Sequence, residues 1–238
     1  MRSVAIDIGN TGTKYGIFEG DALAAQGYFE GQENLPEALL SQAFDHAIVA
    51  SVAQSAQHIQ QRLSVTGKLI ELTAQTALPV SNRYKTPQTL GADRIAAAVG
   101  ANYFFPGRNC LVFDAGTSIT HEYIDSSGNY HGGGISPGLA MKFKALHTFT
   151  QRLPLVHRTK EFPLTGQTTE ESIRSGVLAG TVAELNGFIQ AYTEKAADLV
   201  VILCGGDAGF FESHLKGRIF VIPELVLIGL HRILTHNV

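Results

Sequence analysis

The chain has 238 residues, of which 45% are hydrophobic, so it is long enough for one large domain or two small ones with apolar cores. Its formal net charge is only -3, and it contains no run of Lys or Arg. These features argue against a general nucleic-acid binder and indicate a small ligand.

The cysteines and the N-terminal residues further limit the class of protein that we expect. Cys110 and Cys204 lie far apart, each in an apolar, strand-like run, so we expect reduced core residues rather than zinc ligands. Met1-Arg2-Ser3 leads straight into a strand without a hydrophobic signal region, and no segment approaches about eighteen uninterrupted apolar residues. We therefore expect a cytoplasmic protein with no membrane partner.

The first predicted element is a β-hairpin over residues 4–18 whose turn suits a phosphate group. Apolar residues alternate before the turn and resume after it, as expected of two strands. The turn offers glycine N–H groups that a charged ligand can approach, short polar donors and one positive charge. Its residues are Gly9, Asn10, Thr11, Gly12, Thr13 and Lys14.

Asp7, near the end of the first strand, decides the expected ligand. A carboxylate next to a phosphate repels it unless a divalent cation lies between them, so the hairpin predicts a nucleotide with Mg²⁺. The alternative is an ordinary hairpin turn, because Asx and Gly residues form such turns without any ligand. The hairpin alone favours this alternative, and a second copy further along the chain changes the balance.

Strands and helices follow the hairpin and complete the first half. They are a strand at 22–29, a helix starting within 35–40, a strand at 46–52, an amphipathic helix at 54–63 and a strand at 68–72. Such an order is typical of a mixed sheet with crossover helices. Residues 79–89 are irregular and polar, and a helix is predicted to start in Gly91-Ala-Asp-Arg94.

The second half repeats the order of the first. Strands are predicted at 110–113, 119–124 and 130–135, and the first of them ends in Asp114-Ala-Gly-Thr117, so Asp114 is the counterpart of Asp7. Two like hairpins, each opening about half of the chain, predict two similar domains whose turns face one nucleotide across a cleft. We place these domains at residues 1–108 and 109–238.

The rest of the second half alternates helices with strands around one exposed loop. The predicted elements are a helix at 139–149, a loop at 151–168, a helix at 170–192, a strand at 199–204 ending in Gly205-Gly206, a short helix, a strand at 218–221 and a helix at 224–234.

Four motifs occur together and in order along the chain. They are Asp7-x-Gly-Asn-Thr, Gly91-Ala-Asp-Arg94, Asp114-x-Gly-Thr117 with the glycine-rich stretch 132–138, and Gly205-Gly206. The combination, from Ile6 to about Gly206, resembles type III pantothenate kinases, members of the superfamily of acetate and sugar kinases, heat-shock chaperones and actin. No Walker-type motif occurs, which excludes a P-loop kinase.

The resemblance implies a fold and an activity. The fold is α/β, with two ribonuclease H-like domains of the actin/sugar kinase type, each a mixed five-stranded sheet with flanking helices. The activity is ATP-dependent phosphorylation of pantothenate to 4′-phosphopantothenate, the opening step of coenzyme A synthesis. Family members also place pantothenate in a pocket completed by a second subunit, so a homodimer is expected.

The resemblance also assigns roles at the two ends of the reaction. The first hairpin binds ATP phosphates through Asp7, Gly9, Asn10, Thr11, Gly12, Thr13 and Lys14, with Asp7 on the Mg²⁺ side. Asp93 is the expected catalytic base, and Gly91, Ala92, Asp93 and Arg94 contact pantothenate. The alternative is that Asp93 only favours a helix N-terminus and that Arg94 is a solvated charge.

Six further residues receive roles from the resemblance. Asp114 binds a monovalent cation, K⁺ or NH₄⁺, and Thr117 meets ATP. Tyr84 and Thr169 contact pantothenate, while Gly205 and Gly206 lie on the adenosine side, and these glycines let a flat base approach. Tyr84 could instead pack on a loop surface, and Thr169 could be only the N-cap of its helix.

The sequence departs from the family pattern in three places. Gly12 stands where Asn or His is common, Glu122 replaces an Asp after the second hairpin motif, and Cys204 replaces a Thr. Two other functions remain open: a non-catalytic regulatory relative on the same fold, and a kinase of the superfamily that acts on a sugar or another small molecule. Retention of the three acids Asp7, Asp93 and Asp114 favours the kinase.

Overall fold

The computed structural model describes residues 1–30, 35–51, 61–196 and 198–238, which form two compact units. Unit 1 comprises Met1–Arg108, Glu122–Gly132 and Glu224–Val238, and unit 2 comprises Asn109–His121 and Gly133–Pro223. The boundary predicted after residue 108 coincides with one junction of the units. Residues 122–132 and 224–238, which we expected in the second domain, belong to unit 1. The helix predicted at 54–63 falls largely outside the described residues.

Unit 1 is built on a five-stranded mixed sheet with the order β3-β2-β1-β5-β7. Its strands are β1 (Arg2–Ile8), β2 (Gly12–Glu19), β3 (Ala22–Glu30), β5 (His46–Ser51) and β7 (Leu69–Glu71). The first three form an antiparallel meander, and β5 and β7 run parallel to β1. This arrangement agrees with the predicted hairpin, third strand and crossover strands.

Both faces of β1 are buried, because its alternating side chains meet different layers. Val4, Ile6 and Ile8 pack in a core that includes residues from α1 (Glu37–Leu40) and the short strand β4 (Ala43–Phe44), which pairs with β6 (Ser64–Val65). On the other face, Ser3 bonds the Nδ1 atom of His231 at 3.2 Å. His231 belongs to the last helix, α8 (Leu225–Asn237), which therefore covers the first sheet.

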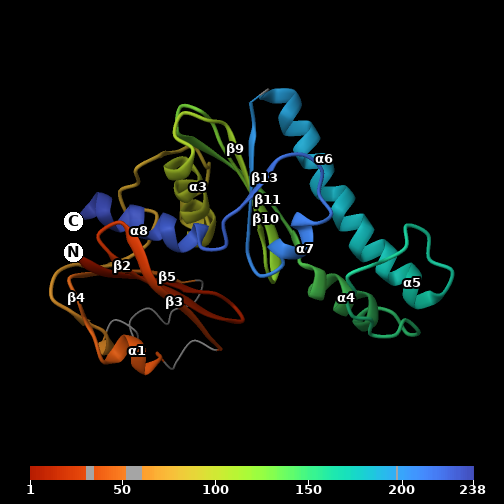
Figure 1. The fold of residues 1–238 in the computed structure, drawn as a ribbon, viewed down its shortest axis with the longest axis horizontal. Helices are drawn as coiled ribbons and strands as arrows, with labels where there is room; N and C mark the ends of the chain where they lie inside the picture. The colour runs from red at the N-terminus through yellow and green to blue at the C-terminus, as the bar shows by residue number, and fades with distance from the viewer. Residues whose placement is uncertain (31–34, 52–60, 197) are drawn as a thin grey trace. The chain divides into compact units, whose positions relative to one another are not determined.

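Helices α3 (Ala92–Phe104) and α8 pack closely, and Figure 1 shows them side by side. A Cβ atom on Gly229 would clash with the carbonyl oxygen of Ala96, and one on Gly100 would lie 2.5 Å from the carbonyl oxygen of Leu225. Every residue from 94 to 101 is buried. The apolar surface of α3 over these residues is thus buried within unit 1.

The second sheet has the order β13-β12-β9-β10-β11-β8. Its strands are β9 (Cys110–Ala115), β10 (Ser118–Ile124), β11 (Asn129–Pro137), β12 (Val200–Cys204), β13 (Ile219–Val221) and β8 (Ser81–Asn82). Strand β8 comes from the stretch predicted to be irregular and pairs in parallel with Asn129 and Tyr130 of β11. The sheet therefore has six strands where five were expected.

Unit 2 adds four α-helices to its strands. They are α4 (Leu139–Thr148), α5 (Thr169–Arg174), α6 (Gly180–Lys195) and α7 (Ala208–Glu212). Helices α5 and α6 follow one another through a π-helical turn at Ser175–Ala179, so the long helix predicted at 170–192 exists but changes its hydrogen bonding at the centre. Within the described ranges, no helix is both long and apolar enough to cross a membrane.

The contact between α3 and α8 predicts opposite results for two Gly→Ala substitutions. Gly229→Ala should lower the free energy of unfolding by about 1–3 kcal/mol, because the new methyl group clashes with the backbone of α3. Gly187→Ala, in an open part of α6, should be neutral or raise it by up to about 1 kcal/mol through helix propensity. Denaturant unfolding measures both, and wild-type stability of Gly229→Ala would contradict the packing.

Candidate active site

The first motif forms the turn between β1 and β2, as predicted. The N–H group of Gly9 donates to the carbonyl oxygen of Gly12 at 3.0 Å, which closes the turn. Asp7 and Lys14 lie directly opposite one another in the pairing of β1 with β2, and Thr13 is buried. The exposed residues of the turn are Asn10, Thr11 and Lys14. The turn thus presents backbone and polar groups next to a partly buried carboxylate.

Tyr28 of β3 accounts for the departure at Gly12. A Cβ atom at position 12 would clash with the hydroxyl group and ring of Tyr28. The same hydroxyl donates to the carbonyl oxygen of Thr11 at 3.3 Å. Tyr28 thereby braces the turn, and glycine is the residue that leaves room for it. The sequence pattern gave no signal for this contact, because it depends on how β2 and β3 are aligned.

The second motif brings Asp114 and Gly205 together within unit 2. The N–H group of Gly116 donates to the carbonyl oxygen of Ser118 at 3.0 Å and closes the turn between β9 and β10. Gly205 has a positive φ of 88°, and a side chain there would clash with the carboxylate of Asp114. It would also lie 2.5 Å from the carbonyl oxygen of Ala115. Only glycine fits this position.

Two further motif residues, Thr117 and Gly138, lie at this turn. A third, Gly206, is open to solvent. The N–H group of Gly138 donates to the carbonyl oxygen of Thr117 at 3.0 Å, and a side chain at Gly138 would clash with that backbone. The position where Gly206 would carry a Cβ atom has open space around it, and the residue is exposed. Cys204 is fully buried and lies opposite Asp114 in the β12–β9 pairing.

The carboxylates of the two turns suit hard cations. Among the described residues, no group of three or more His, Cys, Asp or Glu could hold a metal ion. Mg²⁺ is commonly held by one or two carboxylates together with substrate phosphates and water, which a single acid such as Asp7 can satisfy. Asp114 offers the same oxygen chemistry in unit 2.

The third motif starts helix α3, as predicted. Gly91 is its N-cap residue, and Asp93 lies in the first turn, where the Oδ1 atom accepts the N–H group of Arg94 at 2.8 Å. Within the described part of the chain, the Oδ2 atom of Asp93 accepts no hydrogen bond. Gly91 and Ala92 border a cavity of about 490 Å³. Asp93 therefore helps to begin the helix and keeps a second oxygen for another partner.

Arg94 is not a solvated charge. Its Nε atom donates to Oε1 of Glu122 at 2.6 Å, and its Nη2 atom donates to Oε2 at 3.0 Å. The side chains of Arg94 and Glu122 are only 6% and 1% exposed. Burial by itself would lower the pKa of Arg94, but the hydrogen bond and charge of Glu122 outweigh it and raise the pKa above its usual range. The guanidinium group stays charged.

Two tyrosines complete what we call the acceptor cluster, namely Tyr84, Arg94, Glu122 and Tyr130. The hydroxyl group of Tyr130 donates to Oε2 of Glu122 at 2.5 Å. The guanidinium carbon of Arg94 lies 5.6 Å from the ring centroid of Tyr84, whose ring stacks on that of Tyr130 at 6.3 Å. Tyr84 is thus held by specific contacts. Gly132 has a φ of 94°, and a Cβ atom on it would lie 2.8 Å from the ring of Tyr84.

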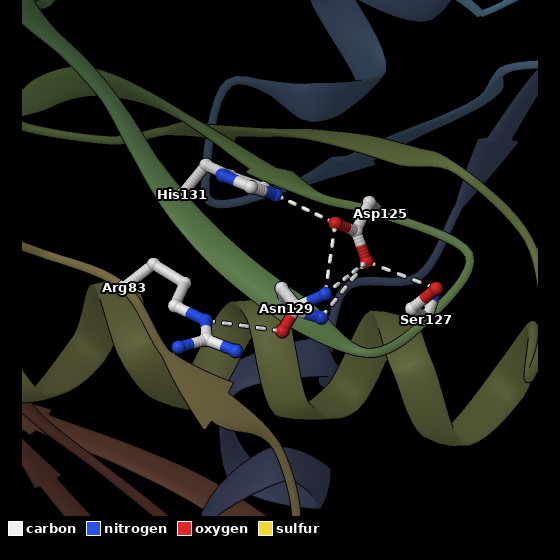
Figure 2. Close-up of polar contacts among 5 residues, drawn as sticks. All are labelled: Arg83, Asp125, Ser127, Asn129 and His131. Atoms are coloured by element: carbon white, nitrogen blue, oxygen red, sulfur yellow. Dashed lines mark hydrogen bonds and ion pairs between the residues drawn. The ribbon is translucent and has the colours of Figure 1, made fainter.

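The turn between β10 and β11 fastens the chain that carries Tyr84 (Figure 2). Figure 2 shows Asp125 accepting hydrogen bonds from Ser127, Asn129 and His131, while Arg83 donates from Nε to Asn129 at 3.2 Å. Burial opposes ionisation of Asp125, but these hydrogen bonds, the His131 contact foremost, lower its pKa to about 2. The residue before Tyr84 is therefore tied to a well-ordered hairpin end.

The alternative that Thr169 is only the N-cap of its helix is wrong. The N-cap of α5 is Thr168, whose hydroxyl oxygen accepts the N–H group of Glu171 at 3.2 Å. The carboxylate of Glu171 in turn accepts the N–H group of Gln167 at 2.8 Å. Thr169 is the first helical residue and is exposed, so its side chain has no capping role there.

Sequence reasoning missed the contacts of Glu122 and Tyr130 and recorded Glu122 only as a departure that left metal geometry open. The structure pairs Glu122 with Arg94 instead. The strand Ser118–Ile124 mixes polar with apolar residues, so its pattern does not mark Glu122 as buried. A buried carboxylate requires a cation or donors, and only the folded chain shows that Arg94 and Tyr130 supply them.

Comparison with known proteins identifies the family of the chain. The family model for type III pantothenate kinase matches residues 3–191. A type III pantothenate kinase from Cytophaga hutchinsonii is 45% identical over 236 residues, covering 99% of this chain and 100% of the relative.

Two solved structures share the fold. A candidate Baf family transcriptional activator from Campylobacter jejuni has a TM-score of 0.64 at 22% identity, covering 98% of each chain. A candidate N-acetylmannosamine kinase from Listeria monocytogenes has a TM-score of 0.52 at 11% identity, covering 100% of each chain. The chain therefore shares its fold with these two proteins, and it belongs to the type III pantothenate kinase family.

Proposed function

We propose that the protein transfers the terminal phosphoryl group of ATP to the hydroxyl group of pantothenate and forms 4′-phosphopantothenate, the first step of coenzyme A synthesis. The observation that carries this proposal is the 45% identity to a type III pantothenate kinase over the whole length of both chains. The motif Gly91-Ala-Asp-Arg94 at the start of α3 supports it, because it offers an acid and a fixed cation at one place.

The nucleotide end of the reaction is assigned to the two turns and the glycine pair. The turn residues Gly9 to Lys14 would bind phosphate through backbone N–H groups, polar side chains and one ammonium group. Bound Mg²⁺ would neutralise phosphate charge, and Asp7 is the group that would hold it, directly or through water. Asp114 would hold a monovalent cation, Thr117 would contact ATP, and Gly205 with Gly206 would leave space for the base.

The acceptor end is assigned to Asp93 and its neighbours. Phosphoryl transfer depends mainly on positioning and on neutralisation of charge, with an acid that accepts the proton of the attacking hydroxyl group. Asp93 suits this role because Oδ1 is held by the Arg94 N–H group while Oδ2 stays available. Tyr84, Arg94 and Thr169 are proposed to contact pantothenate, together with the backbone of Gly91 and Ala92.

Two other functions have less support. A regulatory relative without catalysis would not need Asp7, Asp93 and Asp114 together, and the likeness to a candidate transcriptional activator concerns the fold alone. The likeness to a candidate sugar kinase is also one of fold. We propose a cytoplasmic location, in keeping with Cys110 and Cys204, which are buried thiols that form no disulfide.

Asp93→Asn should lower kcat by about 10² to 10⁴-fold, because the amide cannot accept the proton of the pantothenate hydroxyl group. Asn keeps the size of the side chain and an oxygen for the N–H group of Arg94, so folding and ATP affinity should survive. The measurements are the rate at saturating pantothenate and the affinity for ATP, with the exposed Asp198→Asn as the matched control. Near-wild-type turnover in Asp93→Asn would remove this residue from the mechanism.

Activity should depend on K⁺ or NH₄⁺, because a carboxylate at Asp114 beside a triphosphate requires a cation. The measurement is the rate with Mg²⁺ present in buffers that contain K⁺, NH₄⁺, Na⁺ or Tris alone. Asp114→Asn should lose the activation by K⁺. Full activity of the unmodified protein in Na⁺ or Tris would refute this role of Asp114.

The protein should be a homodimer, as the family resemblance implies for a pocket completed by a second subunit. Tyr103 and Phe104, at the end of α3, remain exposed and could take part in such a contact. Light scattering should give twice the chain mass of 25.5 kDa at working concentration. The mass of a single chain under assay conditions would count against the dimer.

A further inference from the structure

The acceptor cluster is more polar than the packing of unit 1 requires. Replacing a buried ion pair with apolar side chains of similar volume is often neutral or stabilising, because burial removes the hydration of both charges. The pair of Arg94 and Glu122 is therefore a poor device for stability alone. Its place beside Tyr84 and the start of α3 suggests a role in the site that these groups form.

We propose that Glu122 and Tyr130 are positioning residues of the pantothenate site, which act by fixing the guanidinium group of Arg94. The inference rests on the proposed function, since it assigns them to the acceptor of that same reaction. Neither residue is proposed to touch the reacting atoms. They act through Arg94 and through Tyr84, which Arg94 and Tyr130 both contact.

The first step of the argument is the geometry of the ion pair. Glu122 accepts from Nε at 2.6 Å and from Nη2 at 3.0 Å, so two bonds to one planar carboxylate define the plane of the guanidinium group. Arg94 has five N–H donors in a fixed fork, and this side-on pairing leaves the outer edge for other partners. The orientation of that edge is thus set by Glu122.

The second step concerns the length of Glu122 and the role of Tyr130. An Asp at position 122 would retract the carboxylate by one methylene, and a fully buried site leaves little room to compensate. Tyr130 holds Oε2, the same oxygen that receives Nη2 of Arg94. Burial and then the charge of Glu122 raise the pKa of Tyr130, so its hydroxyl group keeps its proton and remains a donor.

The third step is the separation of this cluster from the proposed phosphate-binding turn. The cluster is built from β10, β11, α3 and the residues that follow β8, whereas the turn joins β1 to β2. Loss of Glu122 should therefore displace Arg94 and Tyr84 while the β1–β2 turn keeps its own hydrogen bonds. The expected effect is on pantothenate and not on ATP.

Glu122→Gln tests the inference by removing the charge at nearly constant size. The KM for pantothenate should rise about tenfold or more, as expected for loss of a charged hydrogen bond, while the KM for ATP stays within about twofold. Tyr130→Phe, which removes one hydrogen bond and leaves the ion pair, should raise the KM for pantothenate by a smaller factor of about three to ten. Glu122→Asp should lie between wild type and Glu122→Gln.

The matched control is Glu184→Gln in unit 2, where Glu184 accepts from Lys142 at 2.6 Å in another partly buried ion pair. It should leave the KM for pantothenate unchanged. Circular dichroism and ATP affinity show whether each variant is folded and competent, and calorimetry measures the affinity for pantothenate directly.

Three outcomes would overturn the inference alone, and a fourth would also overturn the proposed function. An unchanged KM for pantothenate in folded Glu122→Gln, or an equal rise for ATP and pantothenate, would overturn the inference while the proposed function stands. If Glu122→Gln does not fold, an unchanged KM for pantothenate in Tyr130→Phe would overturn it instead. Absence of pantothenate turnover by the unmodified protein would overturn the proposed function, and the inference with it.

Discussion

A buried guanidinium group needs a negative partner, and Glu122 provides it for Arg94. Because Arg94 lies in the first turn of α3 and Glu122 lies in β10, this ion pair joins two elements that are distant in the chain. With the β8–β11 pairing and the bond from Arg83 to Asn129, it connects the hairpin segment 122–132 to unit 1, although the strands that contain this segment begin and end in unit 2. Tyr130 and Gly132 in that segment then hold Tyr84. One electrostatic requirement thus organises the proposed acceptor site.

Glycines are the second constraint on the structure. The atoms next to two of them belong to the protein, whereas the motifs suggested contact with a ligand. Gly205 lies against the carboxylate of Asp114, and Gly12 lies under the ring of Tyr28. Backbone contact and a positive φ exclude a side chain at Gly205, whereas at Gly12 a side chain would displace the exposed ring of Tyr28. Access for a ligand is thus not needed to explain Gly205, while Gly206 stands in open space and fits that explanation better.

The last helix shows why chain order alone does not define the units. Strand β1 buries both of its faces, so the first sheet needs a helical layer beyond the elements of its own half. Helix α8 provides that layer by packing on β1, β5 and α3, through the close contact of Gly229 with Ala96. The C-terminal segment thereby belongs to unit 1.

The sequence by itself determined the two hairpins, most strands and helices, and the family, because these follow from local periodicity, turn chemistry and motifs in a fixed order. Only the tertiary structure decided the partner of Arg94, the brace from Tyr28 to the first turn, the added strand β8 and the position of α8. Each of these depends on strand register or on packing between distant residues. The sequence shows Glu122 only as a departure from the family pattern, whereas the folded chain buries its carboxylate against Arg94, because residues 28 positions apart meet there.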